Sequence, residues 1–342
     1  MVHYFKLDNL IGILHELNKQ SKKVQLILIG DPFQLPPVVT QNMKNEYSKK
    51  EKRGLTDEDF YFHCSEKFQK LFVDGVWKCF FMKKNHRQSE EMLITSLYNI
   101  ATGCPEEKNL KYFNQKLLDS DDDSPVQIGT VITPTLDIVH FYNELGLMHY
   151  HCRFQHIPIF EEKLSEYDEI ENSYKGIDDP VNFANEAPII FTQNDDQKRW
   201  ANGTSGVIKD CLMSNSSDIM VIVDVSGKEQ KIIPTRHYLH RLVYNDKTNT
   251  INNECVAIIK KLPFVLGFAL TVHRCQGMNL EKMTFNPGKG CFVPGQLYVA
   301  LSRVRKIDDL YLNNPISEKD IIVSSRTKSY FDDYLSKCED VW

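Results

Sequence analysis

Apolar residues recur along the chain at two spacings, and the spacing changes from one stretch to the next. Residues 8–22, DNLIGILHELNKQSK, carry apolar side chains three and four positions apart after Asp8, a plausible N-cap, and this spacing predicts a helix. Residues 24–30, VQLILIG, form a short apolar run that is typical of a strand buried in a parallel sheet. Helical and strand patterns then alternate through residues 66–146. Such alternation predicts an α/β fold.

The pattern changes near residue 203, where short β-branched runs replace the helical spacing. The runs lie in residues 203–212, 218–234 and 253–262, and Ser226-Gly227 reads as a hairpin turn between two of them. We therefore predict a small all-β insert over residues 203–260. The α/β pattern returns in residues 264–312.

Length and composition are those of an ordinary globular protein. The chain has 342 residues, which leaves room for about two domains. No apolar run approaches the ~18 residues that would span a membrane, and the first ten residues, MVHYFKLDNL, hold no apolar signal core. We expect an intracellular protein of the cytoplasm or nucleus, neither secreted nor bound to a membrane.

Cysteine usage gives no sign of a metal site or a disulfide framework. The nine cysteines are odd in number and none belongs to a C-x-x-C pair, so reduced thiols and no metal site are the better interpretation.

Charge is unevenly distributed along the sequence. The net charge is −5, but residues 234–310 hold 11 Lys and Arg against 5 Asp and Glu, or +6, which leaves −11 for the remainder. The basic stretch could face a polyanion or could simply be an uneven solvated surface, and charge alone does not separate these two interpretations.

The string GDPFQLPPV, residues 30–38, follows the predicted strand at 24–30 and is its most specific feature. In open α/β sheets, ligands bind beyond the carboxyl ends of the strands. A carboxylate such as Asp31 can hold a metal-bound water there, and the amide of Gln34 can orient an attacking water or contact a terminal phosphate. Pro36-Pro37 would stiffen the loop. An ordinary strand-to-loop turn is the alternative.

Three further strings carry candidate chemistry, and each has a structural alternative. Arg87, in NHRQ, could reach a phosphate across a cleft or could be an ordinary surface arginine. Arg303, in GQLYVALSRVR, could act as an arginine finger, worth roughly 10³ to 10⁵ in rate. The stretch FALTVHRCQGMN gathers hydroxyl, imidazole and amide groups, which are donors to a phosphate backbone, although a lone His273 would more often be a core residue. Its candidates are Thr271, His273, Arg274, Gln276 and Gly277.

These strings, in this order, resemble the motifs of superfamily-one helicases, and most closely the RecD-like branch of PIF-type DNA helicases. GDPFQLPPV resembles motif III, NHRQ motif IV, LTVHRCQGMNLEKM motif V and GQLYVALSRVR motif VI, while DDQKRWANGTSGVI resembles the N-G-x-x-G entry to the family's β-barrel insert. The resemblance implies an α/β, RecA-like P-loop NTPase helicase fold. Residues 1–82 would be the remainder of a first RecA-like domain, residues 83–202 and 261–342 a full second one, and residues 203–260 a small β-barrel insert.

The resemblance also implies roles for particular residues. Gln34, Arg87 and Arg303 would be catalytic, Gln34 as sensor of the γ-phosphate of ATP and the two arginines as groups that reach it from the second domain. The nucleotide site would comprise Gly30, Asp31, Gln34, Arg87, Gln276, Gly277 and Arg303. The residues that contact single-stranded DNA would be Thr133, Thr135, Asn202, Thr271, His273 and Arg274.

The sequence departs from the family pattern at single positions and at its beginning. Arg274 replaces the usual lysine and Cys275 the usual serine of motif V, which changes hydrogen-bonding capacity at both positions. No G-x-x-x-x-G-K-[ST] phosphate loop occurs, because neither Gly227-Lys228 nor Gly288-Lys289 is followed by Ser or Thr. No apolar strand of the α/β part ends in the acidic pair of a Walker B motif, and we expect the chain to correspond to the C-terminal portion of a helicase.

The resulting hypothesis is an ATP-dependent 5′-to-3′ DNA helicase that acts on single-stranded and forked DNA in repair or recombination, with ATP and Mg²⁺ as cofactors. By itself the chain should be nearly inactive as an ATPase, and a missing N-terminal segment or a partner chain would carry Walker A and B. The alternative is a non-catalytic single-stranded DNA-binding module, or a subunit that lends its arginines to the P-loop of a partner. A structural protein of another class is a more distant alternative.

Overall fold

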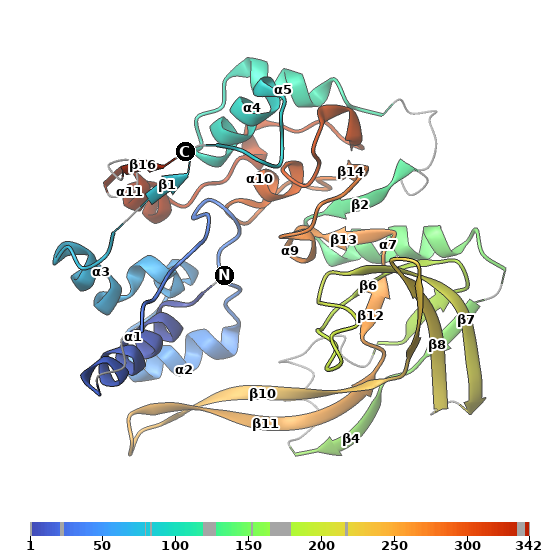
Figure 1. Ribbon diagram of the computed structural model, residues 1–342, viewed down its shortest axis with the longest axis horizontal. Helices are drawn as coiled ribbons and strands as arrows, with labels where there is room; N and C mark the ends of the chain where they lie inside the picture. Colours follow the sequence, from blue (N-terminus) through green and yellow to red (C-terminus); the bar gives the residue numbers. More distant parts are fainter. Residues whose placement is uncertain are drawn as a thin grey trace.

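The computed structural model describes residues 2–20, 24–78, 80–82, 84–118, 128–151, 153–164, 179–215, 218–333 and 339–341. Their backbone forms a helical N-terminal part, a central α/β part and a β-rich part (Figure 1). No helix among these residues combines the length and apolar character needed to cross a membrane.

The N-terminal part is built mainly from helices. It contains α1 (Tyr4–Lys19), α2 (Gln41–Glu51), the 3₁₀ turns η1 (Asp57–Phe60) and η2 (Phe62–Cys64), and α3 (Glu66–Val73). A small core of Leu7, Phe68 and Tyr330 joins α1 and α3 to α11 (Ser325–Asp333) near the end of the chain. The helix predicted over residues 8–22 is therefore present, beginning and ending a few residues earlier.

The strand predicted at residues 24–30 is absent, so this prediction was wrong. The segment has no regular secondary structure and pairs with no strand in the described part of the chain, and Ile29 is 87% exposed. An apolar run indicates a tendency to be buried, but a strand also needs a neighbouring backbone to satisfy its N–H and C=O groups. The only strand of the described N-terminal residues, β1 (Phe80–Met82), pairs in parallel with β16 (Glu339–Val341) instead.

A parallel four-stranded sheet forms the centre of the α/β part. Its order is β13-β2-β14-β15, and each neighbouring pair is parallel. The strands are β2 (Thr130–Thr133), β13 (Ala269–Thr271), β14 (Met283–Phe285) and β15 (Leu310–Leu312).

Helices cover both faces of this sheet. Ile132 and Leu270 face the larger core, which includes side chains of α4 (Glu91–Ala101) and α10 (Gln296–Leu301). The alternate residues Val131 and Ala269 pack against α7 (Leu136–Leu147). Apolar cover on both faces is what a parallel sheet requires, and the predicted α/β order of this region is confirmed. The further elements are α5 (Glu107–Asn114), the short helix α9 (Val272–Cys275), and the 3₁₀ turns η3 (Ile307–Asp309) and η4 (Glu318–Asp320).

The β-rich part consists of three antiparallel groups of strands. One sheet has the order β12-β6-β7-β8-β9, a second the order β10-β11-β4, and β3 pairs with β5. The bounds are β3 (Arg153–His156), β4 (Ile159–Lys163), β5 (Val181–Ala184), β6 (Pro188–Phe191), β7 (Ser205–Asn215), β8 (Asp218–Val225), β9 (Lys228–Ile232), β10 (Thr235–Asn245), β11 (Thr250–Lys261) and β12 (Phe264–Leu266).

The predicted turn chemistry of this part is confirmed. Ser226 and Gly227 both have positive φ, as the tight hairpin between β8 and β9 requires. Asp224, at the end of an apolar run, accepts a hydrogen bond from the Gly227 amide and belongs to this turn. The five-stranded sheet includes β6 and β12, which lie outside the insert predicted over residues 203–260. The pairings among the described strands give an open sheet, with no pairing between its edge strands β12 and β9. The domain bounds stay a prediction.

Candidate functional site

The loop after residue 29 makes the first half of the site. The carboxylate of Asp31 accepts hydrogen bonds from the Phe33 amide at 3.0 Å and from Gln34 Nε2 at 3.4 Å. Leu35 is buried in the core of the α/β part and anchors the loop there. The predicted strand before this loop is wrong, but the loop itself is held in place at its downstream end.

Helix α10 makes the second half, and it touches this loop directly. Tyr298 donates a hydrogen bond from its hydroxyl to Asp31 Oδ2 at 2.7 Å. Gly295, just before the helix, has φ +79°, and a Cβ there would lie 2.5 Å from the Phe33 carbonyl oxygen. A glycine is therefore required for both the turn and the close approach of the two chains.

The side-chain amide of Gln276 connects the loop and α10 to α9. Gln276 Nε2 donates to Gln34 Oε1 at 3.1 Å, so Asp31, Gln34 and Gln276 form one relay of hydrogen bonds. Gly277 follows with φ +86° and faces open space. We call Asp31, Gln34, Gln276 and Tyr298 the relay cluster.

Two arginines lie beside the relay cluster. Arg87 Nη1 donates to the Ser302 carbonyl at 3.1 Å. Arg303 is almost fully buried, and its guanidinium donates to the Val299 carbonyl at 2.7 Å, the Met278 carbonyl at 3.3 Å and Ser302 Oγ at 2.6 Å. Burial lowers the pKa of Arg303, and the neighbouring positive charge of Arg87 acts in the same direction.

The same burial acts on Tyr298. It raises the pKa of the phenol, and the charge of Asp31 adds to that effect. The hydroxyl therefore keeps its proton and remains a donor to the carboxylate at any ordinary pH.

A groove of about 860 Å³ adjoins the relay cluster, and Gln34 and Gln276 both line it. Three of the residues predicted to contact DNA line it, namely Asn202, His273 and Arg274. Burial lowers the pKa of His273, so its imidazole is neutral near neutral pH. Burial lowers the pKa of Lys261, and the positive charge of the nearby Arg274 lowers it further. Arg274 lines the groove and Lys261 lies near it, and two neighbouring cations favour a polyanionic ligand.

The loop before β7 places Asn202 at the edge of this groove. The Asn202 amide donates to Asn194 Oδ1 at 2.9 Å, and the Gly203 amide, at φ +87°, donates to the Phe191 carbonyl at 2.8 Å. Phe191 in turn stacks on Trp200 with ring centroids 4.3 Å apart. The Asn202 side chain thus projects from a backbone fixed at both sides.

The structure does not bring every predicted residue to the groove. Thr133 and Thr271 are paired neighbours at the ends of β2 and β13, and both are buried. The Thr271 hydroxyl accepts from the Arg274 amide as the N-cap of α9, and the Thr133 hydroxyl has no recorded partner among the described residues. Thr135 precedes α7 without a capping bond, and Gly30 is exposed at the start of its loop.

Two residues of the site were missed from the sequence. Tyr298 lies in the GQLYVALSRVR string five positions before Arg303, and no local spacing pointed to its bond with Asp31. Gln88 is buried, and its amide donates to the carbonyls of Ser302 at 3.2 Å and Val304 at 2.9 Å. Its signal was its place directly after Arg87.

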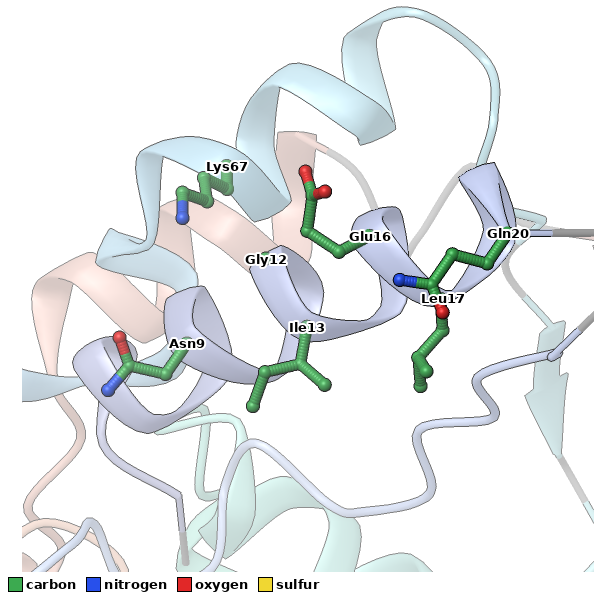
Figure 2. A pocket seen from close by; sticks show the side chains of 7 residues that line it. All are labelled: Asn9, Gly12, Ile13, Glu16, Leu17, Gln20 and Lys67. Carbon is green, nitrogen blue, oxygen red and sulfur yellow. The ribbon is translucent and has the colours of Figure 1, made fainter. Parts of the chain in front are cut away.

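A second cavity, of about 580 Å³, lies along α1 and is separate from this site. Figure 2 shows Ile13 and Leu17 on one side of the helix and Lys67, from α3, on the other. None of the predicted nucleotide or DNA residues lines it.

A parallel sheet covered on both faces, with a loop–helix relay and a groove beside it, is the arrangement of a RecA-like fold. Crystal structures agree with this class. Pif1 helicase from Bacteroides in complex with ADP-AlF3 and single-stranded DNA superposes with a TM-score of 0.73 at 23% identity, covering 98% of this chain and 74% of that one. Pif1 helicase from Candida albicans gives 0.68 at 19% identity, covering 95% and 74%. The predicted RecA-like fold is confirmed.

Sequence comparison leads to the same family. ATP-dependent DNA helicase Pif1 of Bdellovibrio bacteriovorus is 24% identical over 311 residues, covering 84% of this chain and 58% of the relative. The Pif1 helicase of Campylobacter jejuni is 26% identical over 287 residues, covering 82% and 60%. No protein-family model matches. The chain is similar to these PIF-type helicases over more than 80% of its own length, and it spans about 60% of theirs.

Proposed function

We propose that the chain is the part of a PIF-type ATP-dependent DNA helicase that senses the γ-phosphate of ATP and holds single-stranded DNA. The observation that carries this proposal is the continuous path from the relay cluster into the groove. Gln34 belongs to both, because it accepts from Gln276 in the relay and also lines the groove beside Asn202 and Arg274. Gln276 also belongs to both, so a change at a bound phosphate would reach the DNA contacts through these two glutamines.

The nucleotide residues would act on the terminal phosphate. Gln34 would orient the attacking water or contact the γ-phosphate, and Arg87 and Arg303 would neutralise the charge that develops on the transferred group. The Arg303 guanidinium already donates to three acceptors, two in its own segment and one on Met278. To contact a phosphate oxygen it would give up at least one of these hydrogen bonds. Its role as an arginine finger stays a prediction.

The groove residues would bind the DNA backbone. Arg274 and Lys261 would supply positive charge, while Asn202 and neutral His273 would donate hydrogen bonds to phosphate oxygens. We assign 5′-to-3′ movement, forked DNA as substrate and a role in repair or recombination from the relationship to PIF-type helicases. We also propose an intracellular location, since that is where DNA is unwound.

Mg²⁺ would accompany ATP in such a reaction, but the described residues do not form its site. Asp31 is the carboxylate of the relay cluster, and it already accepts from Phe33, Gln34 and Tyr298. Mg²⁺ is usually held by one or two free carboxylates, waters and substrate phosphates. We propose that the phosphate loop and the metal ligands lie outside this sequence, on a preceding segment or a partner chain.

Binding to single-stranded DNA as a function of salt tests the DNA half of the proposal. Each phosphate contact contributes about −0.7 to the slope of log affinity against log salt on single strands. We expect Arg274→Ala to weaken binding and reduce the slope by about that amount, while Lys289→Ala, an exposed position outside the groove, leaves both unchanged. Weak, salt-insensitive binding by the unaltered chain would contradict the proposal.

The second candidate is a DNA-binding module without catalysis, or a subunit that lends Arg87 and Arg303 to a partner's P-loop. It is favoured by one observation, namely that no G-x-x-x-x-G-K-[ST] string occurs in the 342 residues. DNA binding without ATP hydrolysis, both alone and with a P-loop polypeptide of a PIF-type relative added, would support the module. Hydrolysis that appears on that addition would exclude the non-catalytic module and would support either the helicase or the subunit that lends its arginines.

A further inference from the structure

A long hairpin, β10–β11, reaches from the β-rich part to helix α2 of the N-terminal part (Figure 1). At its far end β10 still pairs with β11, and its other edge bonds to side chains of α2. Asn42 Nδ2 donates to the Leu242 carbonyl at 3.1 Å, and the Leu242 amide donates to Asn42 Oδ1 at 2.9 Å. The Tyr244 amide donates to Glu46 Oε2 at 2.8 Å. We call these four residues the latch.

The latch has the features of a specific contact. Asn42 and Glu46 are four residues apart, so they project from one face of α2, and the bonded residues of β10 are two apart, so their amides point to the same edge. Glu46 is only 8% exposed, yet its second oxygen accepts from Lys49 at 2.6 Å. Although burial opposes it, these bonds from Lys49 and Tyr244 lower the pKa of Glu46, and the carboxylate stays charged.

The latch completes a closed circuit of contacts through the molecule. On one side, Gln34 bonds to Gln276. From there the chain leads back through β13 and β12, and the Thr192 amide donates to the Pro263 carbonyl at 2.8 Å. Gln193 then donates to Thr235 Oγ1 at the start of β10. The latch joins β10 to α2, which is connected to Gln34 through residues 35–40.

The groove lies on this circuit. Gln34, Thr192 and Gln276 are members of the circuit and also line the groove. From Thr235 to Leu242 the hairpin spans about 23 Å at roughly 3.3 Å per residue. Thr235 bonds to Gln193, the neighbour of the groove-lining Thr192, so the hairpin starts near the groove wall and extends well away from Thr235.

We propose that the closed latch makes the chain encircle a single strand of nucleic acid, so that DNA enters by threading an end or by opening of the latch. This inference rests on the proposed DNA binding in the groove. It assigns Asn42 and Glu46 a positioning role, since they hold the hairpin against α2 without contacting the strand. Opening breaks three hydrogen bonds, one of them to a charged group, which keeps the open form a minority.

The experiment compares association of the full chain with two forms of one fluorescent oligonucleotide, one with free ends and one with both ends blocked by streptavidin. We expect association with the blocked form to be slower by on the order of tenfold or more, because only the open minority can accept it. In the double variant Asn42→Ala/Glu46→Gln the two rates should approach each other. Asn45→Ala, an exposed position of the same helix that makes no recorded contact with β10, should behave like the unaltered chain.

A milder variant and a locked variant make the test independent of folding. Asn42→Asp keeps the shape of the side chain but cannot donate to the Leu242 carbonyl, so it should also narrow the difference between the two oligonucleotides. A chemical cross-link between cysteines placed at positions 42 and 242, in a background without other accessible cysteines, should abolish association with the blocked form and spare the free-ended form.

The outcomes separate this inference from the proposed function. Equal rates for blocked and free-ended DNA in the unaltered chain, or rapid loading of blocked DNA onto the cross-linked chain, would overturn encirclement while leaving DNA binding intact. Failure to bind even the free-ended strand would overturn the proposed function, and the encirclement with it.

Discussion

The hydrogen bond from Tyr298 to Asp31 makes a sharp prediction about how the two halves of the site are joined. Tyr298→Phe removes only the hydroxyl oxygen, which lies 2.7 Å from Asp31 Oδ2. The carboxylate would keep the Phe33 amide at 3.0 Å and the Gln34 amide at 3.4 Å, so it would lose the shortest of its three hydrogen bonds. The partly exposed Asp31 can recruit some water in compensation.

The expected loss follows from the charge of the acceptor. A hydrogen bond to a charged group contributes about 1.5–3 kcal/mol, and partial solvation of Asp31 lowers this to about 1–2 kcal/mol in the free energy of unfolding. Urea unfolding followed by tryptophan fluorescence measures it. Tyr238→Phe is the matched control, because its side chain is 57% exposed and its hydroxyl makes no recorded hydrogen bond.

A double-mutant cycle assigns the loss to this pair. If the bond is its source, Tyr298→Phe should cost much less in an Asp31→Asn background than in the unaltered chain. A Tyr298→Phe variant whose unfolding free energy stays within about 0.5 kcal/mol of the unaltered chain would refute the reasoning. So would full additivity of the two substitutions.

Three other predictions concern the turn before α10, the stability of the fold in acid, and hydrolysis. Gly295→Ala should destabilise the chain by about 2 kcal/mol or more, because the new Cβ would lie 2.5 Å from the Phe33 carbonyl and the backbone has φ +79°; urea unfolding measures this. Burial lowers the pKa of His63 to about 4. The free energy of unfolding should therefore be highest above the unfolded-state pKa of about 6.5 and should fall by at most about 3 kcal/mol as the pH decreases toward 4. In unfolding curves measured at a series of pH values, His63→Phe should remove this part of the pH dependence. ATP hydrolysis by the chain alone should be negligible in a phosphate-release assay and unaffected by Arg303→Ala.

Each of these predictions has a control and a contrary outcome. Gly54→Ala introduces a Cβ with nothing within 4 Å, and equal stability of the two alanine variants would remove the steric explanation. His15→Gln changes an exposed histidine, and an acid slope that His63→Phe leaves unchanged would exclude that residue as its source. Robust hydrolysis that Arg303→Ala abolishes and Arg305→Ala preserves would show that the chain carries a working phosphate site of its own.

The sequence predicted those parts of the fold in which local pattern and tertiary environment agree. The helix that ends at Ala101, with Gly103 at φ +72°, and the strand–helix pair at residues 130–147 follow from periodicity and turn chemistry. The run at residues 24–30 failed because periodicity carries no information on which backbone will pair with it.

The candidate site divides in the same way. Motif order was enough to single out Gln34, Gln276 and Arg303. In the structure Gln276 bonds to Gln34, and Arg303 bonds to the carbonyl of Met278, two residues after Gln276, although the roles of all three stay predictions. The bond from Tyr298 to Asp31 and the latch at Asn42 join residues that are 267 and 200 positions apart. Such contacts depend on how whole elements are docked, and no local spacing encodes them.

The pairing of β6 with β12 has a consequence for how such proteins change over time. Phe191 and Phe264 are register partners, so the chain leaves for the hairpins and returns from them at the same place. Because departure and return lie side by side, the length between them can grow, shrink or be exchanged without moving the parallel sheet. We expect lineages of this fold to differ most between these two strands, and a grafted domain to be tolerated there more readily than at other positions of the β-rich part.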